Sequence, residues 1–204
     1  MFRNLPALAV LSLAVAACTS ATQSHPARTA TEELLISSAA DRAAEGLSLK
    51  ISKGAKVFVD ATNFDAFDGY SGKYAIGTIR DRFLKQGAHL VDTKAAADTV
   101  VEIRAGALST DEKDFLIGIP SFNLPVPFAG ATTFPKIALY ENQVEEGVAK
   151  FAATSYATKD DTIEVASDPQ FGYSHDAEKT VLIFFSWKSN DTVPALGKDP
   201  KKAW

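Results

Sequence analysis

Cys18 is the side chain in this 204-residue sequence whose surroundings point most clearly to a chemical reaction. An apolar run covers residues 5–14, and the small or short residues Val15-Ala16-Ala17 come directly before the cysteine. A signal peptidase accepts only small side chains next to the bond that it cleaves, so this spacing predicts export and cleavage after Ala17. Ordinary secretion has no use for a thiol at the first mature position, and a single cysteine in an exported protein needs an explanation. Covalent modification of Cys18 supplies one.

Residues 1–17 have the parts of an export signal, with Arg3 as the positive charge near the amino terminus. The apolar run is too short to span a bilayer as a helix, which takes about 20 residues. Val15-Ala16-Ala17-Cys18 resembles the lipobox of bacterial lipoproteins, in which an aliphatic residue and two small residues precede the modified cysteine. The resemblance implies a diacylglyceryl group on the Cys18 thiol and a further acyl chain on its freed amino group. A plain secretory signal that happens to contain a cysteine is the alternative.

The implied anchor also implies a location. Each buried methylene contributes about 0.8 kcal/mol, so several acyl chains hold a protein on a bilayer essentially permanently. In lipoproteins an Asp after the modified cysteine favours retention in the inner membrane, and this sequence has Thr19 there. The resemblance therefore implies the outer membrane, with the domain facing the periplasm.

Composition indicates one folded domain that has no disulfide, because acylation would consume the only thiol. The sequence is 46% apolar, carries a formal net charge of −4, and has no clustered Lys and Arg except at residues 198–202. A nucleic-acid partner is therefore not expected, since phosphate binding needs such clusters. We expect a lipidated tether at 18–28, a single domain at 29–190 and a flexible tail at 191–204.

The periodicity predicts an α+β fold with one mixed or mainly antiparallel sheet and about two helices on one face. One helix should begin with the capping box Thr29-x-x-Glu32 and end at Gly46, and a second should cover residues 71–86. Residues 56–92 would then form a strand–helix–strand unit. Strands are predicted at 56–60, 88–92, 99–108, 136–140, 147–156, 163–166 and 179–188. We expect residues 109–114 to end one strand, residues 142–147 to form a hairpin turn, and residues 167–175 to form a loop.

The stretch 115–130 is unusual because it contains no charge and three prolines. The prolines exclude a helix and a central strand, so the stretch should be irregular. It could fold back as a lid over the core, the ordinary fate of apolar side chains. It could instead remain exposed for a partner protein, a second copy or a membrane. The candidate contact residues are Phe115, Leu116, Ile117, Ile119, Phe122, Leu124, Val126 and Phe128.

Catalytic motifs are absent from the sequence. It contains no Gly-x-Ser-x-Gly, no Walker-type phosphate loop and no dinucleotide-binding glycine pattern. Three histidines and no free cysteine make a zinc site improbable, and His89 and His175 are expected to be structural. The sequence therefore predicts no enzyme, no cofactor and no metal. The loop at 167–175 leaves one catalytic alternative, a hydrolase that uses His175 with a nearby acid.

Three segments together resemble one family of bacterial lipoproteins of unknown function. They are residues 27–35, the apolar loop Gly118-Ile119-Pro120-Ser121 with Pro125 and Pro127, and Phe171-Gly172-Tyr173-Ser174-His175. The resemblance covers most of the mature chain but implies no activity. Our first hypothesis is a non-catalytic lipoprotein that binds another envelope component or itself through the apolar loop. The second is a carrier or sensor of a small apolar ligand, with that loop as a lid.

Overall fold

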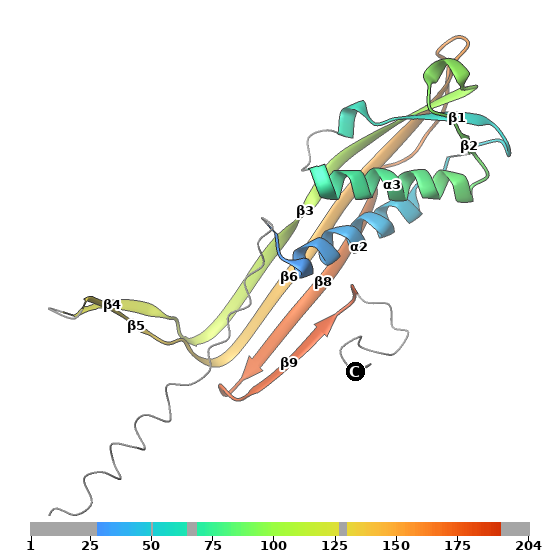
Figure 1. Cartoon of the computed structure of the whole chain (residues 1–204). Coiled ribbons are helices and arrows are strands. Elements are labelled where there is room, and N and C mark those ends of the chain that lie inside the picture. Colours follow the sequence, from blue (N-terminus) through green and yellow to red (C-terminus); the bar gives the residue numbers. More distant parts are fainter. Residues whose placement is uncertain (1–27, 50, 65–68, 127–129, 193–204) are drawn as a thin grey trace, which may run out of the picture.

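The computed structural model describes residues 28–49, 51–64, 69–126 and 130–192. Within them the chain has the predicted α+β architecture, a long mixed sheet with two helices (Figure 1). The helical segments are α2 (Ala30–Gly46), η1 (Thr62–Phe64), α3 (Gly69–Lys85) and η2 (Lys94–Ala96). The strands are β1 (Lys56–Asp60), β2 (His89–Leu90), β3 (Thr99–Ile119), β4 (Phe122–Val126), β5 (Gly130–Phe134), β6 (Ile137–Ala157), β7 (Ile163–Ala166), β8 (Gln170–Val181) and β9 (Phe185–Asn190).

The large sheet has the strand order β2-β1-β3-β6-β8-β9, and β7 pairs with β6 off this path. β1 runs parallel to both β2 and β3, whereas β3, β6, β8 and β9 pair antiparallel. The sequence prediction of a strand–helix–strand unit is therefore confirmed as β1–α3–β2. β4 and β5 form a separate two-stranded sheet.

Three expected interruptions are wrong. Residues 109–114 do not end a strand and residues 142–147 do not form a turn, because Asp111 pairs with Glu146 in the middle of the 21-residue strands β3 and β6. Residues 170–175, expected in a loop, belong to β8. The charged side chains are tolerated there because the ladder satisfies the backbone while the side chains reach water.

The first helix begins as predicted and lies directly on the sheet. The Thr29 hydroxyl accepts a hydrogen bond from the Glu32 amide at 3.2 Å, and the Glu32 carboxylate accepts one from the Thr29 amide. The buried face of α2 contains four alanines, Ala39, Ala40, Ala43 and Ala44, together with the larger Leu35 and Ile36. A second helix, α3, packs alongside α2.

Glycines on the sheet allow this close approach. A Cβ atom on Gly172 of β8 would lie 1.9 Å from the carbonyl oxygen of Ala39, and one on Gly147 of β6 would lie 2.5 Å from that of Leu35. The Ser174 hydroxyl, which is buried, donates a 2.6 Å hydrogen bond to the Leu35 carbonyl oxygen. At these two glycines the backbone of α2 therefore lies directly against the sheet.

The helices cover only one half of the long strands (Figure 1). In that half lies the core, with Phe151 of β6 against Phe64 at a ring-centroid distance of 5.4 Å. Ile103 and Leu108 of β3 are also buried there, but from Ser109 onward the residues of β3 are partly or fully exposed. The sheet thus extends well past its own core, and its far half carries the candidate site.

Candidate functional site: the apolar end of the sheet

Two uncharged segments from distant parts of the sequence meet at the far end of the sheet. Residues 115–135 and 180–187 contain no Asp, Glu, Lys, Arg or His. The strand register places Ile117, Tyr140, Val181 and Phe185 in one row across β3, β6, β8 and β9. The Leu182 amide donates a 2.9 Å hydrogen bond to the Leu139 carbonyl oxygen of β6, the strand that lies between the two segments. We call this region, residues 115–140 with 180–187, the apolar end.

The apolar end exposes large hydrophobic side chains to an unusual degree. Eleven of them have exposed fractions between 42% and 83%, with Phe184 the most exposed. Soluble monomers rarely present contiguous apolar surface beyond a few hundred Å², and larger patches mark contacts with proteins or membranes. The eleven are Phe115, Ile117, Ile119, Phe122, Leu124, Leu139, Leu182, Ile183, Phe184, Phe185 and Trp187.

The region ends abruptly at a row of charged residues. One row beyond Phe115 along the strands lie Asp114, Gln143, Glu178 and Lys188, paired across the sheet in that order. Lys188 forms an ion pair with Glu178 at 2.9 Å. In β3 and β9 the charged residues begin at this row, whereas in β8 they begin one row closer to the tip, at Lys179, and in β6 two rows closer, at Glu141.

In the turn between β8 and β9, two residues have backbone conformations that their side chains disfavour. Leu182 and Ile183 have φ angles of 52° and 69°, in the left-handed region. Hairpin turns with such angles normally use Gly, Asn or Asp, and a β-branched residue there is a genuine outlier. Strain of this kind persists where the side chains are needed, so we interpret the turn as part of the site.

The sequence prediction located one of the two segments of this site. Phe115, Leu116, Ile117, Ile119, Phe122 and Leu124 all lie at the apolar end. Val126 is the last residue of β4, but its side chain, like Phe128 and Cys18, lies outside the described residues. The lid expectation is wrong, because β3 continues to Ile119 and the β4–β5 hairpin projects away from the helices (Figure 1).

Sequence reasoning missed the second segment. Residues 179–188 were expected to form one strand, whereas the chain turns at residues 182–184 between β8 and β9. The turn could not be recognised in the sequence because it lies within five consecutive apolar residues of strong β propensity, Val181-Leu182-Ile183-Phe184-Phe185. The only available signal was their length, because a strand end that is apolar on both faces is unusual in an antiparallel sheet with a solvated side.

Comparison with known sequences shows which family the chain belongs to. The sequence profile of a family of unknown function, DUF6655, matches residues 13–166. The chain belongs to this family. The match includes Cys18, the β4–β5 hairpin and all of β3 and β6, whereas β8 and β9 lie beyond it. No curated protein matches the chain.

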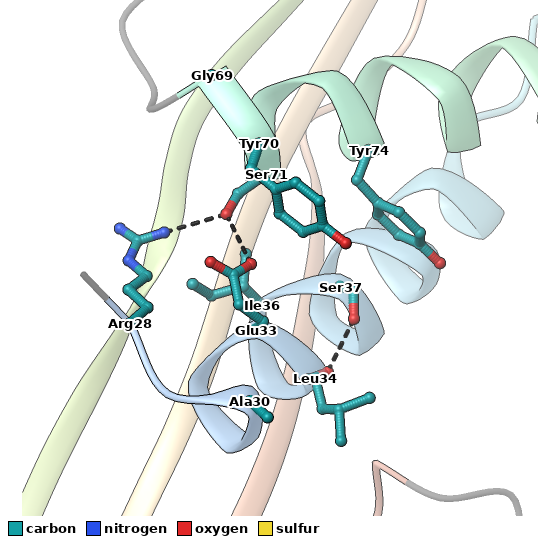
Figure 2. A pocket seen from close by; sticks show the side chains of 10 residues that line it. All are labelled: Arg28, Ala30, Glu33, Leu34, Ile36, Ser37, Gly69, Tyr70, Ser71 and Tyr74. Carbon is teal, nitrogen blue, oxygen red and sulfur yellow. Dashed lines mark hydrogen bonds between the residues drawn. The ribbon is translucent and has the colours of Figure 1, made fainter. Parts of the chain in front are cut away.

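A second candidate site of the DUF6655 chain is a groove between the first turns of α2 and α3 (Figure 2). Its volume is about 990 Å³ and its lining is mostly apolar. On one side the Arg28 guanidinium donates to the Ser71 hydroxyl at 3.1 Å, and that hydroxyl donates to the Glu33 carboxylate at 3.2 Å. Tyr70 and Tyr74 form the α3 side of the groove. The groove could hold a small apolar molecule with one polar end.

His175 has a nearby acid, as the hydrolase alternative requires, and the same acid also binds α2. Its imidazole Nδ1 lies 3.0 Å from the Asp191 carboxylate, and its amide donates to the same carboxylate at 2.8 Å. The Arg42 guanidinium also donates to that carboxylate at 2.7 Å. Burial alone would raise the pKa of Asp191, but the His175 amide and Arg42 outweigh it and lower that pKa. The cluster ties the end of β9 to α2, and no hydroxyl donates to His175 among the described residues.

The two strand histidines lie far apart in the sheet. His89 of β2 and His175 of β8 lie on strands separated by β1, β3 and β6. No group of three or more His, Cys, Asp and Glu residues suited to a metal ion occurs in the part of the chain that the structure describes. In the same ranges no helix is both long and apolar enough to cross a membrane.

Three carboxylates face one another beside the first turn of α2. The register pairs Glu112 with Glu145, and Glu145 with Asp176. Burial, then the charges of Glu32, Glu112 and Asp176, raise the pKa of Glu145 above its ordinary value. An acidic row of this kind destabilises the sheet when it is ionised.

We expect Glu145→Gln to stabilise the protein near neutral pH by about 0.5 kcal/mol, because exposed like-charge pairs contribute tenths of a kcal/mol each. The folded pKa is raised, so the penalty is absent well below the ordinary value of 4.5 and grows as pH rises through the folded pKa. Thermal unfolding across this pH range measures it. Glu146→Gln, which instead removes an ion pair with Lys113, is the control and should give no gain. An equal gain for Glu145→Gln at both ends of the range would contradict the electrostatic explanation.

Proposed function

We propose that this DUF6655 chain is a lipid-anchored protein of the bacterial outer membrane, facing the periplasm, with a non-catalytic role in binding or assembling another envelope component. The observation that carries the proposal is the apolar end, where the fold gathers two uncharged segments that leave eleven large apolar side chains exposed. A side chain of this size contributes about 1.5–3 kcal/mol when it becomes fully buried. Several of them acting together are sufficient for a specific contact even after the costs of association.

The proposed anchor is supported by the sequence around Cys18. The match to the family begins at residue 13, so Val15-Ala16-Ala17-Cys18 falls within the segment that the family shares. Cys18 is the only cysteine in the chain, and acylation accounts for it. The envelope is also where an exposed apolar end would find its partner.

Photocrosslinking in intact cells tests the proposed contact. A photoreactive residue in place of Phe122 should form specific adducts with another envelope component, because this side chain is exposed at the apolar end. Lys159, an exposed residue in the turn after β6 and therefore at the opposite end of that strand, is the control and should form none. Lys150 is less suitable, since its ammonium lies over the Phe171 ring at 5.1 Å. Equal labelling at both positions, or none at Phe122, would contradict the proposal.

A carrier or sensor of a small apolar ligand is the second candidate, and the groove of Figure 2 favours it. In this version the ligand would lie between α2 and α3, with no part for the apolar stretch as a lid. Native mass spectrometry of the purified protein separates the two candidates, because a carrier retains cellular lipid whereas a contact protein does not.

A further inference from the structure

The boundary of the apolar end lies within three adjacent rows of the sheet. The charged residues nearest the tip are Asp114 in β3, Glu141 in β6, Lys179 in β8 and Lys188 in β9, and these three rows contain all four. A narrow boundary of this kind fits the planar surface of a bilayer. The one acid within the apolar end's strand rows, Glu141, is paired with Lys136 and nearly buried. Among the described residues of these rows, therefore, no carboxylate without an ion-pair partner would have to enter an apolar medium.

Aromatic and cationic side chains lie at the boundary itself. Trp187 pairs with Lys179 in the row next to the charged one, and Tyr140 lies two rows closer to the tip than this pair. Trp and Tyr concentrate at the interface between lipid chains and headgroups, where one end of the ring is wet. A lysine at that level can extend its ammonium toward anionic headgroups.

The first helix, which follows the proposed lipidated tether, begins close to this boundary. Thr29 and Glu32 at the start of α2 line the same hollow as Glu145, so α2 begins at the level of Glu145 in β6. Five residues of strand separate Glu145 from Tyr140, about 17 Å at the usual rise. The residues from Cys18 to Arg28 can reach about 33 Å when extended. Acyl chains on Cys18 and the tip of the sheet can therefore enter one membrane surface together.

We propose that the apolar end inserts into the lipid bilayer that holds the Cys18 anchor, with residues 182–185 deepest and Trp187 at the headgroup level. The inference rests on the proposed function for its anchor, and it specifies that the component bound by this end is lipid. A short tether and an inserting tip would fix the domain in one orientation on the membrane. The strained turn then has a physical reason, because Gly or Asn at Leu182 and Ile183 would relax the backbone but remove two of the four large apolar side chains at the tip.

The test uses the purified lipidated protein with Trp204→Phe, which leaves Trp187 as its single tryptophan. It is reconstituted into vesicles of phosphatidylethanolamine and phosphatidylglycerol with bromine on the acyl chains. We expect Trp187 fluorescence to be quenched and its emission shifted to shorter wavelength, relative to vesicles without bromine. Ile183→Asp should abolish both effects, and Asp tolerates the left-handed backbone there better than Ile, so the fold should survive. Ile163→Asp is the matched control, since Ile163 is 69% exposed in β7, outside the apolar end, and should leave quenching unchanged.

The outcomes separate the inference from the proposed function. Mass spectrometry of the same sample reports acylation of Cys18. Acylated, vesicle-bound protein without quenching overturns the inference but leaves the anchor intact, and points to a protein partner for this end. Loss of quenching in Ile163→Asp also overturns it, because the effect would not be specific to the tip. Quenching in unacylated protein supports the inference and contradicts the anchor.

Discussion

Replacing Cys18 by Ser should remove the acyl label from the protein and reduce its share of the outer-membrane fraction by at least about hundredfold. A single acyl chain gives only marginal, reversible attachment, whereas several chains are effectively permanent because each methylene adds about 0.8 kcal/mol. Without acylation, the proposed insertion of the apolar end would be left to hold the described domain on the membrane. The hydroxyl of Ser has nearly the same size as the thiol, so the change tests the chemistry of Cys18 rather than its shape.

Metabolic labelling with an alkyne fatty acid and fractionation of washed membranes make the measurement. Thr19→Ser changes the neighbouring residue with a comparably small alteration and should keep both the label and the location. A Cys18→Ser protein that is still labelled, or still found in the outer membrane at its original level, would rule out Cys18 as the site of attachment.

Gly172→Ala should destabilise the protein by about 3 kcal/mol or more, although it adds one methyl group. The new Cβ would lie 1.9 Å from the Ala39 carbonyl oxygen and 2.6 Å from the Ala43 amide nitrogen. Both atoms belong to the backbone of α2, so a rotamer change cannot relieve the overlap. The helix must shift away from β6 and β8. We expect this shift to cost more free energy than the roughly 1–3 kcal/mol of ordinary overpacking.

Gly77→Ala is the matched control because the same methyl group meets nothing within 4 Å. Gly77 is exposed in the interior of α3, where Ala is favoured over Gly by about 1 kcal/mol, so this variant should be more stable than the parent. Urea unfolding followed by circular dichroism compares the two. Changes of the same sign would show that the contact between α2 and the sheet is less close than its geometry indicates.

Most of the helical layer could be predicted from local signals in the sequence. The capping box at Thr29 and Glu32 specifies where α2 begins, and it does so through hydrogen bonds between residues three apart. The apolar spacing in α3 and the run of β-formers in β1 likewise depend only on neighbours along the chain. Membership of a family of unknown function could also be recognised from the sequence, because a sequence profile depends only on the order of residues along the chain.

Local signals were misleading where the partner strand decides the structure. The polar segments 109–114 and 142–147 look like turns, yet each continues a strand because the other lies beside it through the whole ladder. The same holds for Gly172, which a sequence reader takes for a turn residue. Its real function in the fold, the approach of α2, depends on a helix more than 100 residues earlier in the chain.

The amino-acid sequence by itself determined that the stretch 115–135 is apolar, uncharged and rich in proline, and that Cys18 follows a signal-like run. It could not decide whether that stretch covers the core or leaves it. Only the tertiary structure did so, because the 21-residue ladder of β3 and β6 carries the stretch past the end of the helices. Pairing of β6 with β8 then places residues 180–187 on the other side of β6 from this stretch, at the same end of the sheet. Composition sets what a segment can bind, but pairing between distant strands sets what it lies next to.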